Sequence, residues 1–466
     1  MKRVKNSLGL LCVAPLFMVV NTAAQVLSLK EAEATALQNY NTIKAKSNYA
    51  AASMAAVQQA KRDALPNLVV AAQQDYGTIN GQNGPLYGFG GFGVASSGAA
   101  LPQQNWHAAF GALYLANINW DFFAFGRAKE KIKAATAIAQ QDETDLQQER
   151  FQHQVKVAAA YLNLLAAQRI TRSMQHNLER ADTLQLVVTT KAKNGLIAGV
   201  DSSLADAEVS AARIALLRAM DAEQDRASEL AVLMGVEKPA VLVLDTLFVS
   251  KIPVGVLDTT AVKDDHPELE YYKSRIRVSD EQAKYFGKFS YPTFSVFSVF
   301  QSRGSGFQPG YTTDQSAYTH DYWEGIKPVR SNYLVGVGVS WNLTTPLRIQ
   351  QQVTAQKFIS AGLKNELDLV NQRLNEQQRL AASKMKNAVA AYAEAPVQVK
   401  AASDAYLQKS VLYRNGLTTI VDVTQSLYAL TRAETDRDIA YNNVWQALLL
   451  KAAAAGDFNL FMTELP

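Results

Sequence analysis

The sequence is nearly free of cysteine. Its one cysteine is Cys12, and it lies inside the first 24 residues. We expect residues 1–24 to be a signal peptide, because a basic start leads into a short apolar stretch and the small-residue site Thr22-Ala23-Ala24. A membrane anchor would need an apolar run of about 18 residues, and a lipid-modified precursor would carry a small residue where Leu11 stands. Without this segment the chain has no disulfide and no thiolate metal site.

Long apolar runs are also missing. No stretch after residue 24 approaches the roughly 18 apolar residues of a transmembrane helix, so any part of the chain that enters a membrane must do so as strands. The formal net charge is +4, and it falls to about +1 when Lys2, Arg3 and Lys5 leave with the leader. This balance gives no reason to expect nucleic acid as a partner.

Groupings of residues that perform chemistry are absent too. Five histidines are scattered without the spacing of metal ligands, and no Ser/His/Asp set or carboxylate pair stands out. We therefore predict no cofactor, no metal and no enzyme. An enzyme or binding module built on residues 235–264 would need a concave polar site, and the sequence indicates none.

What the sequence does contain is a repeated layout. Asn194-Gly195-Leu196 with Val200-Asp201 recurs as Asn415-Gly416-Leu417 with Val421-Asp422, an offset of 221 residues. Trp120 and Arg127 recur at the same offset as Trp341 and Arg348, and Pro66 recurs as Pro292 at an offset of 226. A period this long is too large for a solenoid unit, so it indicates an internal tandem duplication of one half-structure.

Each half should contribute two membrane-length strands. Apolar residues alternate with polar or small ones in four segments of about ten residues, which suits tilted strands in a bilayer. The predicted apolar faces consist of Leu68, Val70, Ala72 and Tyr76; Ala112, Tyr114, Ala116, Ile118 and Trp120; Phe294, Val296 and Phe300; and Tyr333, Val335, Val337, Val339 and Trp341. Loops 77–106 and 302–332 should separate the strands within each half. A soluble sheet with one buried face is the alternative.

Helices account for most of the remaining chain. We expect one over 28–64, one over 267–288, and two long ones over 127–194 and 347–414 that turn at the Asn-Gly pairs. The returning helices should begin at about 202 and 423, with Asp201 and Asp422 as N-caps. The alanine-rich composition favours helices packed side by side in a layer, and an ordinary two-stranded coiled coil is the alternative.

These elements predict four parts: a signal peptide (1–24), a first repeat (25–234), a connecting segment (235–264) and a second repeat (265–466). Four strands cannot close a membrane barrel, which needs about eight or more, and an open edge in lipid leaves backbone groups unpaired. Membrane insertion therefore requires several copies of the chain, and three copies would supply twelve strands.

This layout resembles the TolC family of outer-membrane efflux and secretion channels over essentially the whole chain after the leader. The resemblance rests on the junction Trp120-Asp121-Phe122-Phe123-Ala124-Phe125-Gly126-Arg127 and on the two turns, of which residues 415–423 are the more specific. It implies a mainly helical homotrimer with one shared 12-stranded β-barrel in outer-membrane lipid. The long antiparallel helices would form an α-barrel across the periplasm of a Gram-negative bacterium. A periplasmic adaptor and an inner-membrane RND or ABC-type pump would be the partners.

The resemblance also points to residues at the tips of the helices. Asp422 matches an acidic residue at the family's periplasmic constriction, while the position of a second family aspartate holds Gln425. Tyr413 and Asp201 match a pair that links neighbouring hairpins, and Thr418 stands where another link has arginine. Asp201 and Asp422 can equally be helix caps with no role in a pore. Lys191, Lys193 and Arg414 flank the tips, and we interpret them as solvated surface charges.

The function expected from this layout is a passive export duct for small molecules. Its lumen would be lined in the barrel by Asn117, Asn119, Ser340 and Asn342, with Trp120 and Trp341 at a membrane interface. A duct for protein secretion is an alternative that the sequence does not separate. In a different class, a secreted coiled-coil structural or adhesive protein without a pore would share the helical pattern.

Overall fold

The computed structural model describes residues 26–81, 88–89, 92–93, 99–236, 244–245, 253 and 263–465. The chain divides into two compact units. A strand-bearing unit contains residues 45–148 and 267–371, and a helical unit contains residues 1–44, 149–266 and 372–466. The expected signal peptide lies outside the described residues, as does most of the expected connecting segment 235–264.

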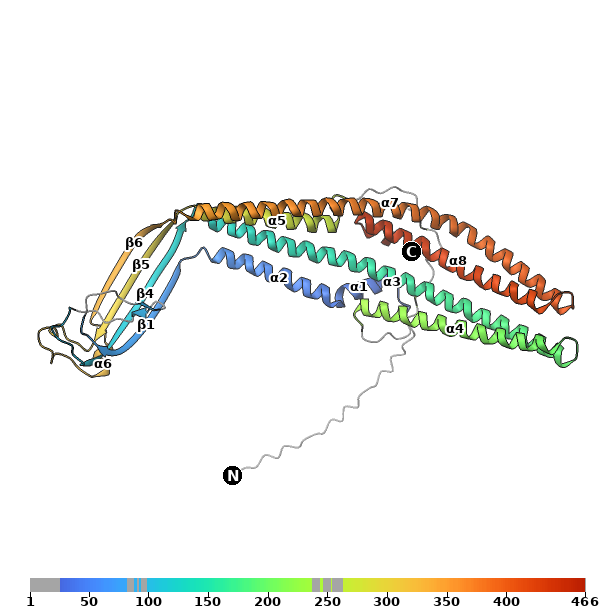
Figure 1. Ribbon diagram of the computed structural model, residues 1–466, viewed down its shortest axis with the longest axis horizontal. Helices are drawn as coiled ribbons and strands as arrows, with labels where there is room; N and C mark the ends of the chain where they lie inside the picture. The colour runs from blue at the N-terminus through green and yellow to red at the C-terminus, as the bar shows by residue number, and fades with distance from the viewer. Residues whose placement is uncertain are drawn as a thin grey trace, which may run out of the picture. The chain divides into compact units, whose positions relative to one another are not determined.

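The elements follow the repeated layout along the chain (Figure 1). The helices are α1 (Leu29–Asn39), α2 (Asn41–Arg62), α3 (Arg127–Lys193), α4 (Gly199–Met234), α5 (Pro267–Gly287), the 3-10 helix η3 (Lys288–Ser290), α6 (Tyr322–Ile326), α7 (Thr345–Arg414), α8 (Ile420–Ala455) and α9 (Asn459–Met462). The strands are β1 (Asn67–Thr78), β2 (Gly88–Phe89), β3 (Phe92–Gly93), β4 (Ala108–Phe123), β5 (Thr293–Ser305) and β6 (Arg330–Ser340). Within the described residues, no helix combines the length and the apolar character needed to cross a bilayer.

The four expected strands form one antiparallel sheet in the order β1-β4-β5-β6. They are longer than expected, with 16 residues in β4 and 13 in β5. The expected loop 302–332 is correspondingly shorter, because β5 continues to Ser305 and β6 starts at Arg330. Within that loop, α6 packs on the sheet, where the Tyr114 hydroxyl donates to the Ile326 carbonyl at 3.1 Å.

The register places the predicted apolar faces on one side of the sheet. Val70 lies opposite Ala116, Ala116 opposite Phe300, and Phe300 opposite Tyr333. Directly opposite residues of an antiparallel pair point to the same side, and alternate residues point to the other. We call the side that carries Val70 the apolar face and the other side the polar face. The predicted alternation is confirmed on all four strands.

One close approach on the polar face requires glycine. The ring of Phe297 on β5 covers β6 at Gly336, where a Cβ atom would lie only 2.5 Å from the ring's Cζ. Glycine has no side chain to clash there, and the aromatic ring restores contact that a glycine in a strand otherwise loses. The alternation of valine and glycine in β6 thus reflects the shape of its neighbour.

The helices of the strand-bearing unit lie side by side in a single layer, as predicted. Lys46 of α2 forms an ion pair with Asp145 of α3 at 2.9 Å. A side-chain hydrogen bond joins α3 to α5. Arg275 of α5 then forms an ion pair with Glu366 of α7 at 2.6 Å. The order α2-α3-α5-α7 repeats the order of the strands to which these helices connect.

The helical unit has an apolar core built from widely separated segments. The core joins α1, α3, α4, α7, α8 and α9 and includes the fully buried side chains of Tyr161, Trp445 and Phe461. The Tyr161 hydroxyl donates to the Leu27 carbonyl at 2.7 Å, which fixes the start of the described chain to α3. Satisfying its hydroxyl allows this tyrosine to be buried without an unpaired polar group.

The expected single helix over 28–64 is wrong, because two helices meet at Tyr40. Tyr40 has φ −65° and ψ 120°, which is extended backbone. Its ring stacks on the buried ring of His153 in α3 with 3.9 Å between the centroids. Local composition favours an unbroken helix, but the tertiary contact of one side chain outweighs that preference.

Candidate functional site at the tips of the helical hairpins

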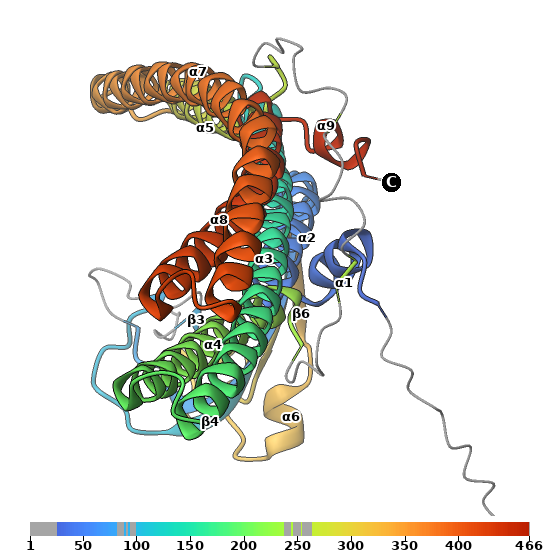
Figure 2. The ribbon, with the colours of Figure 1, turned by 90° about the vertical axis from the view of Figure 1, so that its right-hand side faces the viewer.

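The two hairpins, α3–α4 and α7–α8, turn in the same way at their tips (Figure 2). Gly195 and Gly416 have φ values of 71° and 75°, a left-handed conformation that favours glycine. The residue after each glycine donates its backbone N–H to the carbonyl five positions back, at 2.9 Å in both turns. These bonds define Schellman motifs, which close the last turn of α3 and of α7. Asn194 and Asn415 precede the glycines and are both exposed, and the Asn415 amide also donates to the Val411 carbonyl.

The returning helix α4 begins earlier than expected. Its N-cap is Ala198, which makes no side-chain cap, and Gly199 and Val200 are already helical. The prediction that Asp201 is the N-cap is therefore wrong. Asp201 lies in the first turn of α4, where its negative charge interacts favourably with the positive end of the helix dipole.

The returning helix α8 begins at a complete capping box. Thr419 is the N-cap and accepts from the Asp422 N–H, while the Asp422 carboxylate accepts from the Thr419 N–H. The prediction that Asp422 is the N-cap is wrong by three positions, because the threonine hydroxyl fills that role. The two tips therefore differ in how firmly their returning helices are started.

The Asp422 carboxylate is the focus of the second tip. One of its oxygens accepts from the hydroxyls of Thr419 at 2.7 Å and Thr418 at 2.8 Å. The other lies 3.5 Å from the ammonium group of Lys409 on α7. The threonine hydrogen bonds, with a smaller contribution from Lys409, hold the pKa of Asp422 well below its usual range. Asp422 therefore keeps its negative charge throughout the neutral pH range. Gln425 lies one turn later in α8 and is exposed.

Lys191 joins the two tips, which the sequence did not indicate. Its ammonium group donates to the carbonyls of Tyr413 at 2.9 Å and Arg414 at 2.8 Å. These are among the last carbonyls of α7, which have no partner within that helix. A cation there also meets the negative end of the helix dipole. The interpretation of Lys191 as a solvated charge is therefore wrong, whereas Lys193 is exposed as expected.

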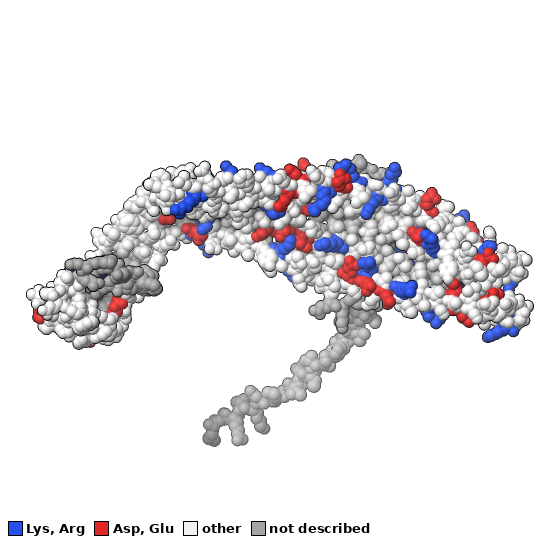
Figure 3. Space-filling view, in the orientation of Figure 1, with Lys and Arg blue, Asp and Glu red and all other residues white. Residues whose placement is uncertain are grey.

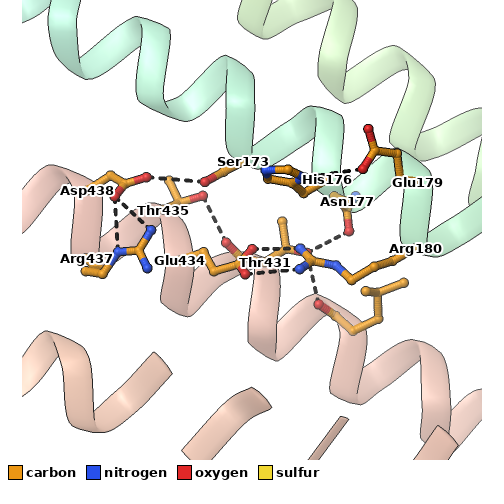
Figure 4. Close-up of polar contacts among 11 residues, drawn as sticks. Ser173, His176, Asn177, Glu179, Arg180, Thr431, Glu434, Thr435, Arg437 and Asp438 are labelled. Carbon is orange, nitrogen blue, oxygen red and sulfur yellow. Dashed lines mark hydrogen bonds and ion pairs between the residues drawn. The ribbon is translucent and has the colours of Figure 1, made fainter. Parts of the chain in front are cut away.

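Above the tips, a polar seam joins α3 to α8 (Figure 4). Arg180 and Glu434 form a two-point ion pair with N–O distances of 3.0 and 2.6 Å, and both side chains are largely buried. The seam continues through Asn177, whose side-chain oxygen accepts from the Thr431 hydroxyl at 2.6 Å. One turn further from the tips, Ser173 donates to Asp438, which Arg437 also contacts. Paired, planar geometry makes the Arg–Glu contact a strong link between the hairpins.

The predicted lumen residues do not all lie on the strands. Asn117 and Asn119 lie on the polar face of β4, and Ser340 lies on the same face at the end of β6. Asn342 lies two residues beyond the end of that strand. Its side chain accepts from the Thr344 N–H at 3.1 Å, which forms the turn that leads into α7.

The two tryptophans have matching contacts. Trp120 donates its indole N–H to the Ala64 carbonyl at 2.9 Å, and Trp341 donates to the Ser290 carbonyl at 3.2 Å. Both acceptors stand two residues before the proline that precedes β1 or β5. Among the described residues, no group of three or more metal-ligating side chains comes together in either unit.

Comparison with known proteins bears on these features. The sequence profile of the family described as "Outer membrane efflux protein" matches residues 32–236, which span α1 to α4. Over these residues, which make up less than half of the chain, the sequence matches the outer membrane efflux protein family. A comparison with curated protein sequences finds no match.

Solved structures of similar fold extend the likeness to both repeats. The outer membrane protein VceC from Vibrio cholerae is 16% identical with a TM-score of 0.70, over 92% of this chain and 96% of VceC. CusC is 12% identical with a TM-score of 0.71, over 92% of each chain. The open state of MtrE from Neisseria gonorrhoeae is 14% identical with a TM-score of 0.68, over 92% of this chain and 89% of MtrE. At these identities, the likeness concerns the fold.

One link expected from the family resemblance is not present within the single chain. Tyr413 is 4% exposed, and its hydroxyl makes no hydrogen bond to Asp201 or to any other described residue. Its ring instead packs in an apolar cluster with Val188, Ile420 and Val423, and Lys191 lies 5.1 Å from the ring centre. Burial raises the pKa of the Tyr413 hydroxyl. In this chain, Lys191 rather than the tyrosine hydroxyl supplies the polar link between the tips.

Proposed function

We propose that this protein is the outer-membrane channel of a tripartite export system, a passive duct through which small molecules leave the cell. The observation that carries the proposal is the distribution of charge over the sheet. The four long strands contain four charged residues, and every one of them lies on the polar face. They are Asp75, Asp121, Arg303 and Arg330.

The apolar face has the composition of a lipid-facing surface. It has no charged residue, and its valines, leucine and aromatic residues on β1 and β6 are largely exposed in the single chain. Figure 3 shows few charged side chains over the visible side of the strands and many over the helices. A lysine or arginine at the bilayer midplane on such a face costs about 2–4 kcal/mol. A soluble sheet has no comparable reason to exclude charge from an exposed face.

The open edges of the sheet support association of several copies, and a homotrimer is the assembly that we propose. Each of the sheet's outer strands, β1 and β6, has one edge without a partner strand among the described residues, and unpaired backbone groups in lipid cost several kcal/mol each. Three copies close a barrel of twelve strands. The helical unit supports association too, because apolar side chains of α4 and α7 stand exposed, including Ile214, Leu217, Val397 and Leu407.

The tips support a partner at the periplasmic end. Leu196 and Val200 on the first hairpin, and Leu417 and Val421 on the second, are all more than half exposed. They occupy matched positions in the two repeats, so a trimer presents six equivalent apolar pairs. A periplasmic adaptor that engages these pairs would connect the duct to an inner-membrane pump, and the pump would select the solute. Release of the Lys191 contact would accompany opening.

Two lysine substitutions at neighbouring levels of the sheet test the duct. Val337→Lys places a charge on the apolar face, and Asn119→Lys places the same charge on the polar face. We expect Val337→Lys to abolish recovery in the outer-membrane fraction. Asn119→Lys should insert, conduct in planar bilayers and show a shifted cation-to-anion permeability ratio. Equal behaviour of the two variants, or recovery of the parent protein as a soluble species, would contradict the proposal.

A further inference from the structure

The two open edges of the sheet match each other in length and direction. β1 has 12 residues and β6 has 11, and the alternating order of the antiparallel sheet makes them run in opposite directions. They are also the most exposed of the four long strands. The inference drawn from these edges rests on the proposed duct, in which β6 of one copy lies beside β1 of the next.

The edges carry opposite charges at the same end of the sheet. Asp75 lies three residues before the end of β1, and Arg330 is the first residue of β6. Both lie on the polar face and both are exposed. Arg330 forms no ion pair within the described part of the chain. The Asp75 carboxylate accepts from the Gln73 side-chain amide at 2.9 and 3.0 Å, which steadies it on the polar face.

Arg330 also sits directly opposite another arginine. In the β5–β6 register, Arg303 and Arg330 are paired residues on the polar face. Like charges directly opposite one another destabilise a strand pair. Because β6 is an outer strand, any side chain beside Arg330 on the open edge must belong to another molecule. The arrangement therefore favours an acidic group on whatever strand pairs with β6.

Parity limits how β6 can pair with β1 of another copy. A shift of one residue would turn every side chain to the wrong face, so Arg330 must stand opposite an odd-numbered residue of β1. Overlap of the full strands places it opposite Gly77, and a shift of two residues places it opposite Asp75 itself. In the first case the two charges are diagonal neighbours, within reach of a long side chain. Gly77 has no side chain to intervene and has open space around its Cα atom.

We propose that Arg330 forms an ion pair with Asp75 of the partner subunit across each junction of the barrel. The pair balances the arginine opposite Arg330 and limits the register in which copies join to these two alignments. A trimer contains three such junctions, each on the water-filled side of the sheet. The chain thus recognises a second copy of itself through charge on the polar face as well as through backbone hydrogen bonding.

Paired cysteines test the contact directly, because the chain has one native cysteine, and Cys12→Ser removes it. Asp75→Cys combined with Arg330→Cys, treated with a short bismaleimide reagent in the outer membrane, should give covalent dimers and trimers on a denaturing gel. The matched control is Asp75→Cys combined with Ser340→Cys, which uses the same two strands at opposite ends and should stay monomeric. Covalent trimers in the control alone, or in neither pair, would overturn the ion pair.

Charge exchange separates the contact from the duct itself. Asp75→Arg or Arg330→Asp alone should lower the trimer-to-monomer ratio in detergent roughly fivefold for each pair, and the double exchange should restore it. If Arg330→Asp alters only ion selectivity and leaves the trimer unchanged, the arginine faces solutes and the inference fails while the duct stands. If the parent protein is monomeric and does not conduct, the proposed function fails as well.

Discussion

Trp120 donates its indole N–H to the carbonyl of Ala64 at 2.9 Å. The bond joins the end of β4 to the residue two positions before Pro66, where the chain leaves α2 for β1. Trp341 makes the equivalent bond to Ser290, two positions before Pro292. Each repeat therefore fastens the end of its second strand to the start of its first, at the junction between the helices and the sheet.

Removing either indole donor should have the same effect in both repeats. Trp120→Phe and Trp341→Phe each lose one hydrogen bond while keeping the ring, so we expect a loss of about 0.5–1.5 kcal/mol in unfolding free energy. Denaturant titration in detergent measures the change. Trp106→Phe is the control, because that side chain is 80% exposed and makes no hydrogen bond among the described residues. A larger effect from the control would argue against the junction role.

Lys191→Met should loosen the closed tip. Methionine keeps an apolar stem against Tyr413 but cannot donate to the two carbonyls at the end of α7. We therefore expect a higher resting conductance in planar bilayers, with the trimer intact. Lys193→Met removes the same charge two residues later at an exposed position and should leave conductance unchanged. Identical traces from both variants would assign Lys191 a purely electrostatic surface role.

Asp422→Asn should remove an acid-sensitive contribution to the tip. Because the pKa of Asp422 is lowered in the folded state, its contribution to stability is fully present above the unfolded pKa of about 4, declines below that pH and is lost as pH falls through the folded pKa. The parent should therefore protect the amides of residues 419–424 from hydrogen exchange better than the variant at pH 7. The difference between the two proteins should begin to narrow below about pH 4 and should close only at a pH below the lowered folded-state pKa. Parallel curves over the whole range would show that the carboxylate contributes little.

Asp422→Ala tests the expected role of this charge in the pore. If three copies of the carboxylate converge on an axis, the substitution should weaken cation selectivity and block by divalent cations. Single-channel recordings at neutral pH measure both properties. Unchanged selectivity would confine Asp422 to starting α8, a role that its contacts with Thr418 and Thr419 already explain.

Arg180 and Glu434 should prove energetically coupled. Arg180→Met or Glu434→Gln leaves a largely buried partner without its counterpart, and we expect each to cost about 1–3 kcal/mol. The double variant should cost less than the sum, which a double-mutant cycle measures. Arg226 and Glu229 form a half-exposed pair on α4 and serve as the control. Exposed pairs contribute about 0–1 kcal/mol, so comparable coupling in both pairs would discount the seam.

The sequence determined the elements whose causes are local. Alternation along the strands follows from the different surroundings of the two faces of the sheet, and the glycine turns follow from backbone conformations that other residues disfavour. Both features are written in a few neighbouring residues, so the four strands, the long helices and the tips at Gly195 and Gly416 were predictable from the chain alone.

The tertiary structure decided which side chains serve those elements. The sequence suggests a surface charge at Lys191, but in the fold the final carbonyls of α7 lie within hydrogen-bonding reach of its ammonium group. The family resemblance suggests a hydrogen-bonding role for Tyr413, but packing buries its hydroxyl. The break at Tyr40 depends on His153, more than a hundred residues away. The opposition of Arg303 and Arg330 depends on strand register. Contacts between distant segments compete with local preference, and only the folded chain shows which of them is satisfied.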